Sequence, residues 1–411
     1  MEDIALYQQI LGFKEPWRVK TVQLQRKEGE ILVQVECTEK DWACSHPGCG
    51  QRMHLHDWET RRWRHLDSCQ FKTIVQADVP RVRCAEHGSV TVSVPWAEKY
   101  GRFTAMFERL AIDVMRECSI SGACDLMRIS WEEADGIKQR AVKRGLQRKQ
   151  PQVNPLLCVD DKSVARRHQY VTVVARVDGT QTIVDYVGED RKKQSLDAYW
   201  RSLTSEQLEG IQCVAMDMWE PFVASTAASV PDGARKICHD PFHIVQHMNK
   251  AVNDVRKAEQ RSLGADGDNP LQGTRWDWLH GMENVPEDRQ PAFDAIKLSQ
   301  LKTARAWTLK EVLRTLWTFQ TEAGARKHFR RWYGWAIRCR LEPVKRVARM
   351  VKKRLDNVVN YCRHRLSNGP IEGLNNKIQG LTKKAYGYRN RQRFINDIYF
   401  HCGGLDLYPT Q

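Results

Sequence analysis

The chain has 411 residues, 41% of them hydrophobic, with 65 Lys and Arg against 50 Asp and Glu and a formal net charge of +15. This apolar content argues against wholesale disorder, and no run of about 18 uncharged apolar residues is present to span a membrane. Residues 322–411 hold 20 Lys and Arg against 6 Asp and Glu, so nearly all the excess charge lies near the C-terminal end. We therefore expect a polyanionic partner, with nucleic acid favoured over a merely solvated basic face.

The length predicts two to four compact units. Most of the thirteen cysteines lie in apolar surroundings such as "LLCVDD" and "IQCVAM", which is typical of reduced, buried thiols in a cytosolic protein. The N-terminal stretch "MEDIALYQQILGFKEPW" lacks the basic-then-apolar build of a signal peptide. We therefore expect a cytoplasmic protein.

Residues 1–100 are rich in cysteine, and we predict a zinc-binding domain there. "CSHPGCG" supplies Cys44 and Cys49, and "RVRCAEHG" supplies Cys84 and His87. Each pair brackets a short loop with glycine next to its last ligand, and two such loops can complete one closed tetrahedral zinc site. The first loop is longer than the usual two-residue gap, so other ligands stay open. These rivals are Cys37, His46, His54 and His56.

Residues 101–150 indicate a helix-turn-helix DNA-binding domain. In "FTAMFERLAIDVMREC" the apolar residues are spaced for one buried face of a helix. They are Phe103, Phe107, Leu110 and Val114. A short helix follows in "SISGACDLMRI", and a basic helix then begins with Ser130 as its N-cap. This order favours DNA binding, although generic three-helix packing would look similar. The side chains expected to face DNA are Lys138, Arg140, Lys143 and Arg144.

From residue 151 the pattern changes to strands. Segments 156–164, 169–178 and 180–189 indicate three consecutive strands joined by short turns. Helices and strands then alternate up to a long helix that ends near residue 261. Three antiparallel strands followed by alternating helices and strands is the order of the ribonuclease-H-like fold. We therefore predict an α/β core of that class, whose first part is 151–261.

Residues 262–366 indicate helices rich in tryptophan. This is more chain than such a core needs before its last helix, so we predict a helical insertion. Residues 367–411 then return to the core, with its last helix and a basic tail. Ser367 and Asn368 are expected to cap this helix.

Two acids lie in the predicted sheet. Asp160 stands in an apolar run of the first strand, and Asp217 ends the fourth, in "VAMDMW". A buried carboxylate is costly unless something compensates its charge. If the strands pair as proposed, the two acids are adjacent, and divalent cations between them would offset their repulsion.

A third acid, Glu372, begins the last helix. The apolar stripe of that helix is expected at Ile371, Leu374, Ile378 and Leu381. Glu372 then flanks the buried face and can lean over the sheet, although it could simply complement the helix dipole. Three further residues are expected to support the acids without binding the metal themselves: Asn375, Asn376 and His243.

The chain resembles the transposases of bacterial insertion sequences, specifically the ISL-three family. The resemblance runs nearly end to end and is carried by the cysteine strings, the helix-turn-helix, "VDDKSV", "AMDMWEPF", "DPFHIVQHMN" and "SNGPIEGLNNKIQGLTKKAYGYRN". It implies a DDE triad on Asp160, Asp217 and Glu372. It also implies zinc on Cys44, Cys49, Cys84 and His87.

The family usually has an Asp-Glu pair at the first acid, whereas this chain has Asp160 and Asp161. Because neighbours on a strand point to opposite faces, only one of them can serve, and we take Asp160.

The resemblance implies cleavage and strand transfer of double-stranded DNA, namely the terminal inverted repeats of the transposon and its target. Two Mg²⁺ or Mn²⁺ ions about 3.5–4 Å apart suit this chemistry and the hard oxygen ligands. We expect a homodimer or higher oligomer in the synaptic complex, at the bacterial nucleoid.

Bases of the C-terminal segment can hold the phosphates that pass through this site. They are Lys377, Lys383, Lys384, Arg389, Arg391 and Arg393. The alternatives are a DNA-binding regulator, built from the zinc domain and the helix-turn-helix, and a plain nuclease without strand transfer.

Overall fold

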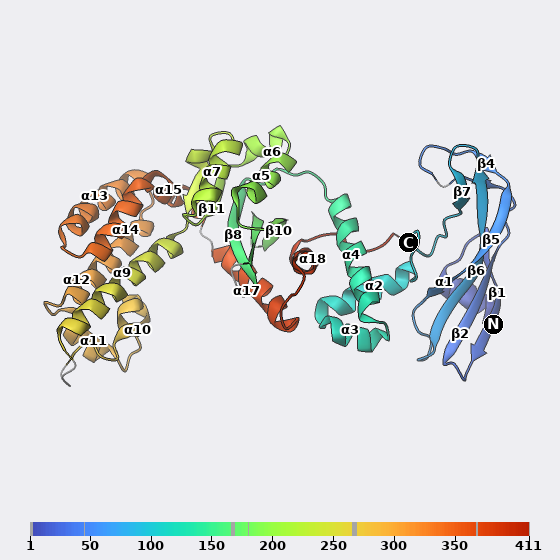
Figure 1. The fold of residues 1–411 in the computed structure, drawn as a ribbon, viewed down its shortest axis with the longest axis horizontal. Coiled ribbons are helices and arrows are strands. Elements are labelled where there is room, and N and C mark those ends of the chain that lie inside the picture. Colours follow the sequence, from blue (N-terminus) through green and yellow to red (C-terminus); the bar gives the residue numbers. More distant parts are fainter. Residues whose placement is uncertain are drawn as a thin grey trace. The chain divides into compact units, whose positions relative to one another are not determined.

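The computed structural model describes residues 3–44, 46–165, 169–179, 181–264, 269–366 and 369–410. The chain forms two compact units (Figure 1). One consists of residues 1–149 together with 405–411, and the other of residues 150–404. No helix in the described ranges is both long and apolar enough to cross a membrane.

The first unit begins with helix α1 (Asp3–Leu11) and a five-stranded sheet. The strand order is β1-β2-β6-β5, with β7 paired to β6. The bounds are β1 (Trp17–Gln25), β2 (Glu30–Cys37), β5 (Leu55–Arg64), β6 (Lys72–Cys84) and β7 (Gly88–Thr91). Two short strands, β3 (Trp42–Ala43) and β4 (Arg52–Met53), pair separately. Buried Trp17, Trp63 and Trp96 belong to the core on this sheet.

Three helices follow, as the sequence predicts: α2 (Ala105–Glu117), α3 (Ile120–Met127) and α4 (Trp131–Arg148). The predicted N-cap of α4 is confirmed. The Ser130 hydroxyl accepts from the backbone N–H of Glu133, and the Glu133 carboxylate accepts from the backbone N–H of Ser130. This reciprocal pair satisfies two of the amide groups that a helix start leaves without partners.

The predicted buried face of α2 is partly wrong. Phe107 is buried, but Leu110 is 43% exposed and Val114 is half-buried. Glu108 is buried in their place and pairs with Arg140 and Arg144 of α4, with 3.1 Å from Arg144 Nη2 to Glu108 Oε2. A carboxylate can be buried in a small domain when positively charged side chains pair with it. The guanidinium groups of Arg140 and Arg144 neutralise Glu108 in this way.

Residues 405–410 pack on α4, which was not predicted from the sequence. Leu407 is fully buried, and its carbonyl accepts a hydrogen bond from Arg144. The Tyr408 hydroxyl donates to Asp113 of α2, and Arg148 Nη1 donates to the Tyr408 carbonyl at 2.6 Å. The C-terminal segment therefore belongs to the same folded unit as helices α2 and α4.

The second unit is built on a five-stranded mixed sheet with the order β10-β9-β8-β11-β12. The strands are β8 (Leu156–Ala165), β9 (Gln169–Asp178), β10 (Gln181–Gly188), β11 (Cys213–Met216) and β12 (Ile237–His239). β8, β9 and β10 are antiparallel neighbours, while β11 is parallel to both β8 and β12. The three predicted strands are confirmed. β11 ends one residue earlier than expected, so Asp217 directly follows the strand.

Helices lie against both faces of this sheet (Figure 1). Leu157, Val159, Val214 and Met216 share a buried cluster with α5 (Lys193–Ser202) and α7 (Glu220–Ser229). α6 (Ser205–Gly210) and α8 (Gly233–Lys236) are short connecting helices. On the other face, α17 (Gly369–Lys384) contacts β8 and β10, and α18 (Arg391–Cys402) contacts β10.

The α17 apolar stripe is buried as predicted. The proposed caps Ser367 and Asn368 lie outside the described residues.

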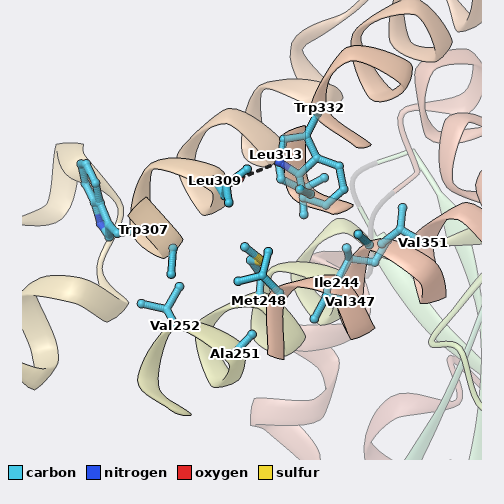
Figure 2. Packing of buried hydrophobic residues seen from close by; sticks show 14 of the residues in the cluster. Ile244, Met248, Ala251, Val252, Trp307, Leu309, Leu313, Trp332, Val347 and Val351 are labelled. Atoms are coloured by element: carbon cyan, nitrogen blue, oxygen red, sulfur yellow. Dashed lines mark hydrogen bonds between the residues drawn. The ribbon is translucent and has the colours of Figure 1, made fainter. Parts of the chain in front are cut away.

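The helical part is organised around α9 (Pro241–Ser262). Its Ile244, Met248, Ala251 and Val252 form one core with the helices that follow (Figure 2). Trp332 is buried in the same core and donates its indole N–H to the Leu309 carbonyl at 2.8 Å. The remaining elements are α10 (Arg275–Leu279), η1 (Met282–Asn284), α11 (Gln290–Lys297), α12 (Lys302–Arg314), η2 (Thr315–Thr318), α13 (Glu322–Arg338), α14 (Glu342–Lys353), α15 (Leu355–Val359) and α16 (Tyr361–His364).

The last helices of the helical part contact β12, the strand after which the helical part begins. The side-chain amides of Asn357 and Asn360 donate to the Ile237 carbonyl of β12 at 3.2 and 2.7 Å. The Cys238 thiol lies 3.5 Å from the Leu366 carbonyl. The chain therefore re-enters the sheet region beside its exit point.

We expect Leu407→Ala to destabilise the first unit by about 2–5 kcal/mol, because it leaves a cavity beside α4. Leu110→Ala removes an exposed side chain of the same type and should change stability by less than about 0.5 kcal/mol. Thermal unfolding of the two full-length variants compares them. Equal melting temperatures would show that the tail is not part of the folded unit.

Candidate metal centres and active site

The first candidate site joins the β3–β4 loop to the β6–β7 turn. Cys44 and Cys49 flank the loop, Cys84 ends β6, and His87 precedes β7. Cys44 Sγ lies 3.7 Å and Cys84 Sγ lies 3.4 Å from His87 Nδ1, and Cys49 Sγ lies 3.8 Å from Cys84 Sγ. Zinc–sulfur bonds of about 2.3 Å in a tetrahedron place neighbouring ligand atoms about 3.8 Å apart. The observed spacings therefore fit one tetrahedral zinc ion.

The Cys84 thiol is prepared to act as a thiolate. Burial acts to raise the pKa of Cys84, but hydrogen bonds from His87 and from the backbone of Glu86 outweigh it and lower this pKa to about 6. Among the described residues, this quartet alone gathers three or more Cys, His or acidic ligand atoms within 4.8 Å. The rival His46 stacks on the His87 ring with 4.1 Å between centroids.

The second candidate site lies where β8 meets α17. Leu157 and Val159 point into the α5–α7 cluster, so alternation turns Asp160 to the opposite face. The Asn375 amide of α17 donates to Asp160 Oδ2 at 2.6 Å, which fixes Asp160 under that helix. Asp161 is half-buried, and its backbone N–H donates to Asp160 Oδ1 at 2.8 Å.

Asp217 lies beside Asp160 because β8 and β11 are parallel. Val159 pairs with Met216 in this register, so the next step along both strands brings the two acids together. The Trp219 backbone N–H donates to Asp217 Oδ1 at 2.9 Å.

The carboxylates crowd one another. Burial raises the pKa of Asp217, and the charge of Asp160 adds to this shift while the Trp219 N–H and His243 oppose it. Burial together with the charges of Asp160 and Asp217 raises the pKa of Asp161 to about 6. Ionising such a cluster is unfavourable unless a cation lies between the groups, so the donor set fits a hard divalent ion.

Glu372 lies exposed near the start of α17. Burial lowers the pKa of Lys162, and the charges of Asp160, Asp161 and Glu372 oppose that shift, so Glu372 lies within electrostatic range of β8. The ligand atoms of Asp160, Asp217 and Glu372 do not lie as close together as those of the Cys/His quartet. A two-metal site does not require such close spacing of all three acids, because each ion binds a different subset of them.

The three residues that were expected to support the acids differ in placement. Asn375 is buried against Asp160, and its Oδ1 has no hydrogen-bond partner among the described atoms. His243 is half-buried with Nε2 3.9 Å from Asp240 Oδ2, and its charge acts on Asp161 and Asp217. Asn376 is exposed.

Comparison with known proteins identifies the family. A family model described as "Transposase", of the ISL3 group, matches residues 157–398, which is more than half of the chain. The chain belongs to the ISL3 transposase family. A zinc-finger model of transposases IS204/IS1001/IS1096/IS1165 matches residues 41–87, and the helix-turn-helix model of transposase family ISL3 matches residues 92–142. The predicted family, zinc-finger region and helix-turn-helix are thereby confirmed.

Two relatives match over nearly their whole length. The transposase for insertion sequence element IS1557 of Mycobacterium tuberculosis is 26% identical over 424 residues, covering 96% of this chain and 94% of the relative. The transposase for insertion sequence element IS1001 of Bordetella parapertussis is 23% identical over 394 residues, covering 94% of this chain and 96% of the relative.

The bases of α4 in this family member are mostly turned inward. Lys138 and Arg144 are buried, and Arg140 is half-buried on Glu108. Of the four, only Lys143 is exposed. All four were predicted to face DNA. For Lys138 and Arg144 this prediction is wrong, since both are buried and Arg144 binds Glu108 and the Leu407 carbonyl.

The bases of the last segment lie mostly at the surface. Lys377 donates to the His401 carbonyl at 2.9 Å through its Nζ, and Arg391 is half-buried at the start of α18. The exposed members of the predicted set are Lys377, Lys383, Lys384, Arg389 and Arg393.

Three residues near the acids were missed by sequence reasoning. Lys162 follows Asp160 by two residues on the same strand, so alternation itself could have placed it on the α17 face. Trp219 stands in the quoted "VAMDMW" string, two residues after Asp217. Arg191 carried no local signal, because only the folded chain brings it over Trp219.

We expect the purified protein to carry about one zinc ion per chain, and Cys84→Ser and His87→Ala to release it. Cys37→Ser removes a rival cysteine and should keep the metal. Elemental analysis of freshly purified, unchelated protein measures this. Zinc retained by Cys84→Ser but lost by Cys37→Ser would reassign the ligands.

Proposed function

We propose that this chain binds the ends of its insertion sequence and catalyses metal-dependent DNA cleavage and strand transfer through Asp160, Asp217 and Glu372. The observation that carries the proposal is the pairing of β8 with β11. It brings Asp160 and Asp217 together on the face that α17 covers, and α17 carries Glu372.

The order of the sheet supports a ribonuclease-H-like core. An antiparallel hairpin of three strands is extended by two parallel strands, and helices cover both faces. The helical part between β12 and α17 is then an insertion into that core. Asp160 lies in the central strand β8, and Asp217 directly follows the neighbouring central strand β11, so the sheet positions the backbones of both acids.

The chain's own residues have distinct roles in this proposal. Asp160 and Asp217 would hold the ions from the sheet, and Glu372 from the helix. Bound Mg²⁺ or Mn²⁺ would supply Lewis-acid activation of the attacking oxygen and stabilisation of the leaving oxygen. The Asn375 amide orients Asp160, and the Trp219 N–H orients Asp217. Both acids are thereby held in one rotamer before DNA arrives.

Asp160 is preferred to Asp161 as the first acid. Asp160 shares its strand face with the α17 contact, whereas alternation places Asp161 on the other side of β8. Asp161 would then act on the site only through its charge.

The first unit would recognise the transposon ends. A structural zinc ion would hold the β3–β4 loop to the β6–β7 turn, and α4 would contact DNA through Lys143 and neighbouring exposed groups. A homodimer or higher oligomer would bring two ends together in the synaptic complex.

Three substitutions test the triad: Asp160→Asn, Asp217→Asn and Glu372→Gln. Each should keep folding and end binding, because removing one of several like charges relieves repulsion. Each should lose cleavage and strand transfer by orders of magnitude, because the metals stabilise the transition state. Incubation with end DNA and Mg²⁺, with nicks and joined products mapped on a sequencing gel, measures both activities.

Asp161→Asn is the matched control and should stay largely active. Activity of Asp160→Asn together with inactivity of Asp161→Asn would move the first acid by one residue. Normal nicking by Glu372→Gln would refute the triad. Nicks without joined products in the wild type would favour the plain nuclease, and the absence of both would favour the regulator.

Lys143→Ala should weaken binding to all duplexes and reduce the log–log salt slope by about 0.9, because one phosphate contact is lost. Arg144→Ala should instead lower the melting temperature, because Glu108 loses one of its two partners. Binding titrations at several salt concentrations and thermal melts separate these effects. An unchanged salt slope in Lys143→Ala would remove α4 from the DNA interface.

A further inference from the structure

A hollow that the triad does not use is lined by Trp219, whose backbone N–H donates to Asp217. Its volume is about 770 Å³, within the range of about 300–1,000 Å³ typical of small-ligand sites. Its walls come from β9, the turn before α5, the start of α7 and the start of α18. The residues that matter for its chemistry are Tyr170, Arg191, Lys192, Trp219 and Arg391.

One wall is a fixed aromatic stack. The Arg191 guanidinium lies 4.2 Å from the centre of the Tyr170 ring and 4.8 Å from the Trp219 ring. The Trp219 indole N–H donates to the Arg191 carbonyl at 3.2 Å, and its backbone N–H donates to Asp217. Trp219 is nevertheless 37% exposed. A flat apolar surface is therefore held rigidly two residues from a proposed catalytic acid.

The charges of the hollow favour an anion. Two carboxylates also line the hollow, but Asp190 faces Lys192 at 3.4 Å and Glu220 is paired with Arg354. Lys193 faces Asp197 at 2.8 Å, so the two lysines are largely neutralised as well. Arg191 and Arg391 form no ion pair with any carboxylate of the described residues. The buried Nε of Arg391 also has no hydrogen-bond partner there. Two guanidinium groups therefore remain to meet a negatively charged ligand.

We propose that this hollow binds one unpaired nucleotide of the DNA next to the scissile phosphate, with its base on Trp219 and its phosphate on Arg191 and Arg391. The inference rests on the proposed function, because it assumes that the DNA being cleaved runs past Asp217. A flat ring with guanidinium groups beside it matches a base attached to a phosphate. A paired base is covered on both faces by its neighbours, so it must leave the duplex to stack on an indole.

The test uses full-length protein in Ca²⁺ buffer and a single-stranded oligonucleotide that carries the fluorescent base 2-aminopurine. Stacking on Trp219 should quench the probe, and Trp219→Ala should abolish this quenching and weaken binding about 5- to 150-fold, as expected for one lost base stack. Trp219→Phe keeps an aromatic face and should retain most of both. Arg391→Ala should weaken binding, and Arg391→Lys should partly restore it.

Matched controls locate the stacking site. Trp335→Ala removes a tryptophan of α13 that is 39% exposed and should change neither quenching nor affinity. Trp276→Ala removes the 55% exposed tryptophan of α10. Loss of quenching in Trp276→Ala but not in Trp219→Ala would overturn the proposal and move base stacking to the helical part.

An abasic oligonucleotide makes the test independent of any folding defect. Wild-type protein should bind it as weakly as Trp219→Ala binds the intact strand, and the combination should weaken binding no further. Additive losses would overturn the proposal. Because no cleavage is measured, quenching through Trp219 in a protein that never nicks end DNA would sustain the nucleotide site while refuting the proposed function.

Discussion

The parallel pairing of β8 with β11 is the constraint on which the proposed active site depends. It brings Asp160 and Asp217 side by side at the middle of the sheet, where backbone hydrogen bonds prevent the two strands from moving apart. Burial, with a further contribution from the repulsion between neighbouring carboxylates, raises the pKa of Asp217 and of Asp161. The fold therefore maintains a concentration of negative charge that water alone would not favour, and a cation is the simplest compensation.

The helical part can be large because it has its own hydrophobic core and because its two ends lie at the same strand. α9 leaves the sheet after β12, and its inner face forms a core with the helices that follow (Figure 2). Asn357 and Asn360 then bind the Ile237 carbonyl, so the chain returns to the strand from which it departed. α17 can consequently cover the same sheet, although 128 residues of sequence separate Cys238 of β12 from Leu366, which lies shortly before α17.

Positive charge has two different uses in this protein. Arg140 and Arg144 neutralise the buried Glu108, and Arg144 also binds the Leu407 carbonyl, so these bases stabilise the first unit. Arg191 and Arg391 form no ion pair with a carboxylate of the described residues, and both line the hollow at Trp219. A count of charges cannot distinguish the two uses, because both give the same excess of Lys and Arg over Asp and Glu.

The sequence by itself determined the elements whose patterns are local. The capping box at Ser130, the apolar stripe of α17 and the strand alternation around Asp160 depend on neighbours within a few residues, and each was predictable. The grouping of Cys44, Cys49, Cys84 and His87 was also predictable, because two short loops carry all four residues. Tertiary structure alone decided that Leu110 is exposed, that the C-terminal tail packs on α4, and that Arg191 lies over Trp219. These outcomes depend on contacts between residues far apart in the chain, and such contacts leave no periodicity in the sequence from which they could be inferred.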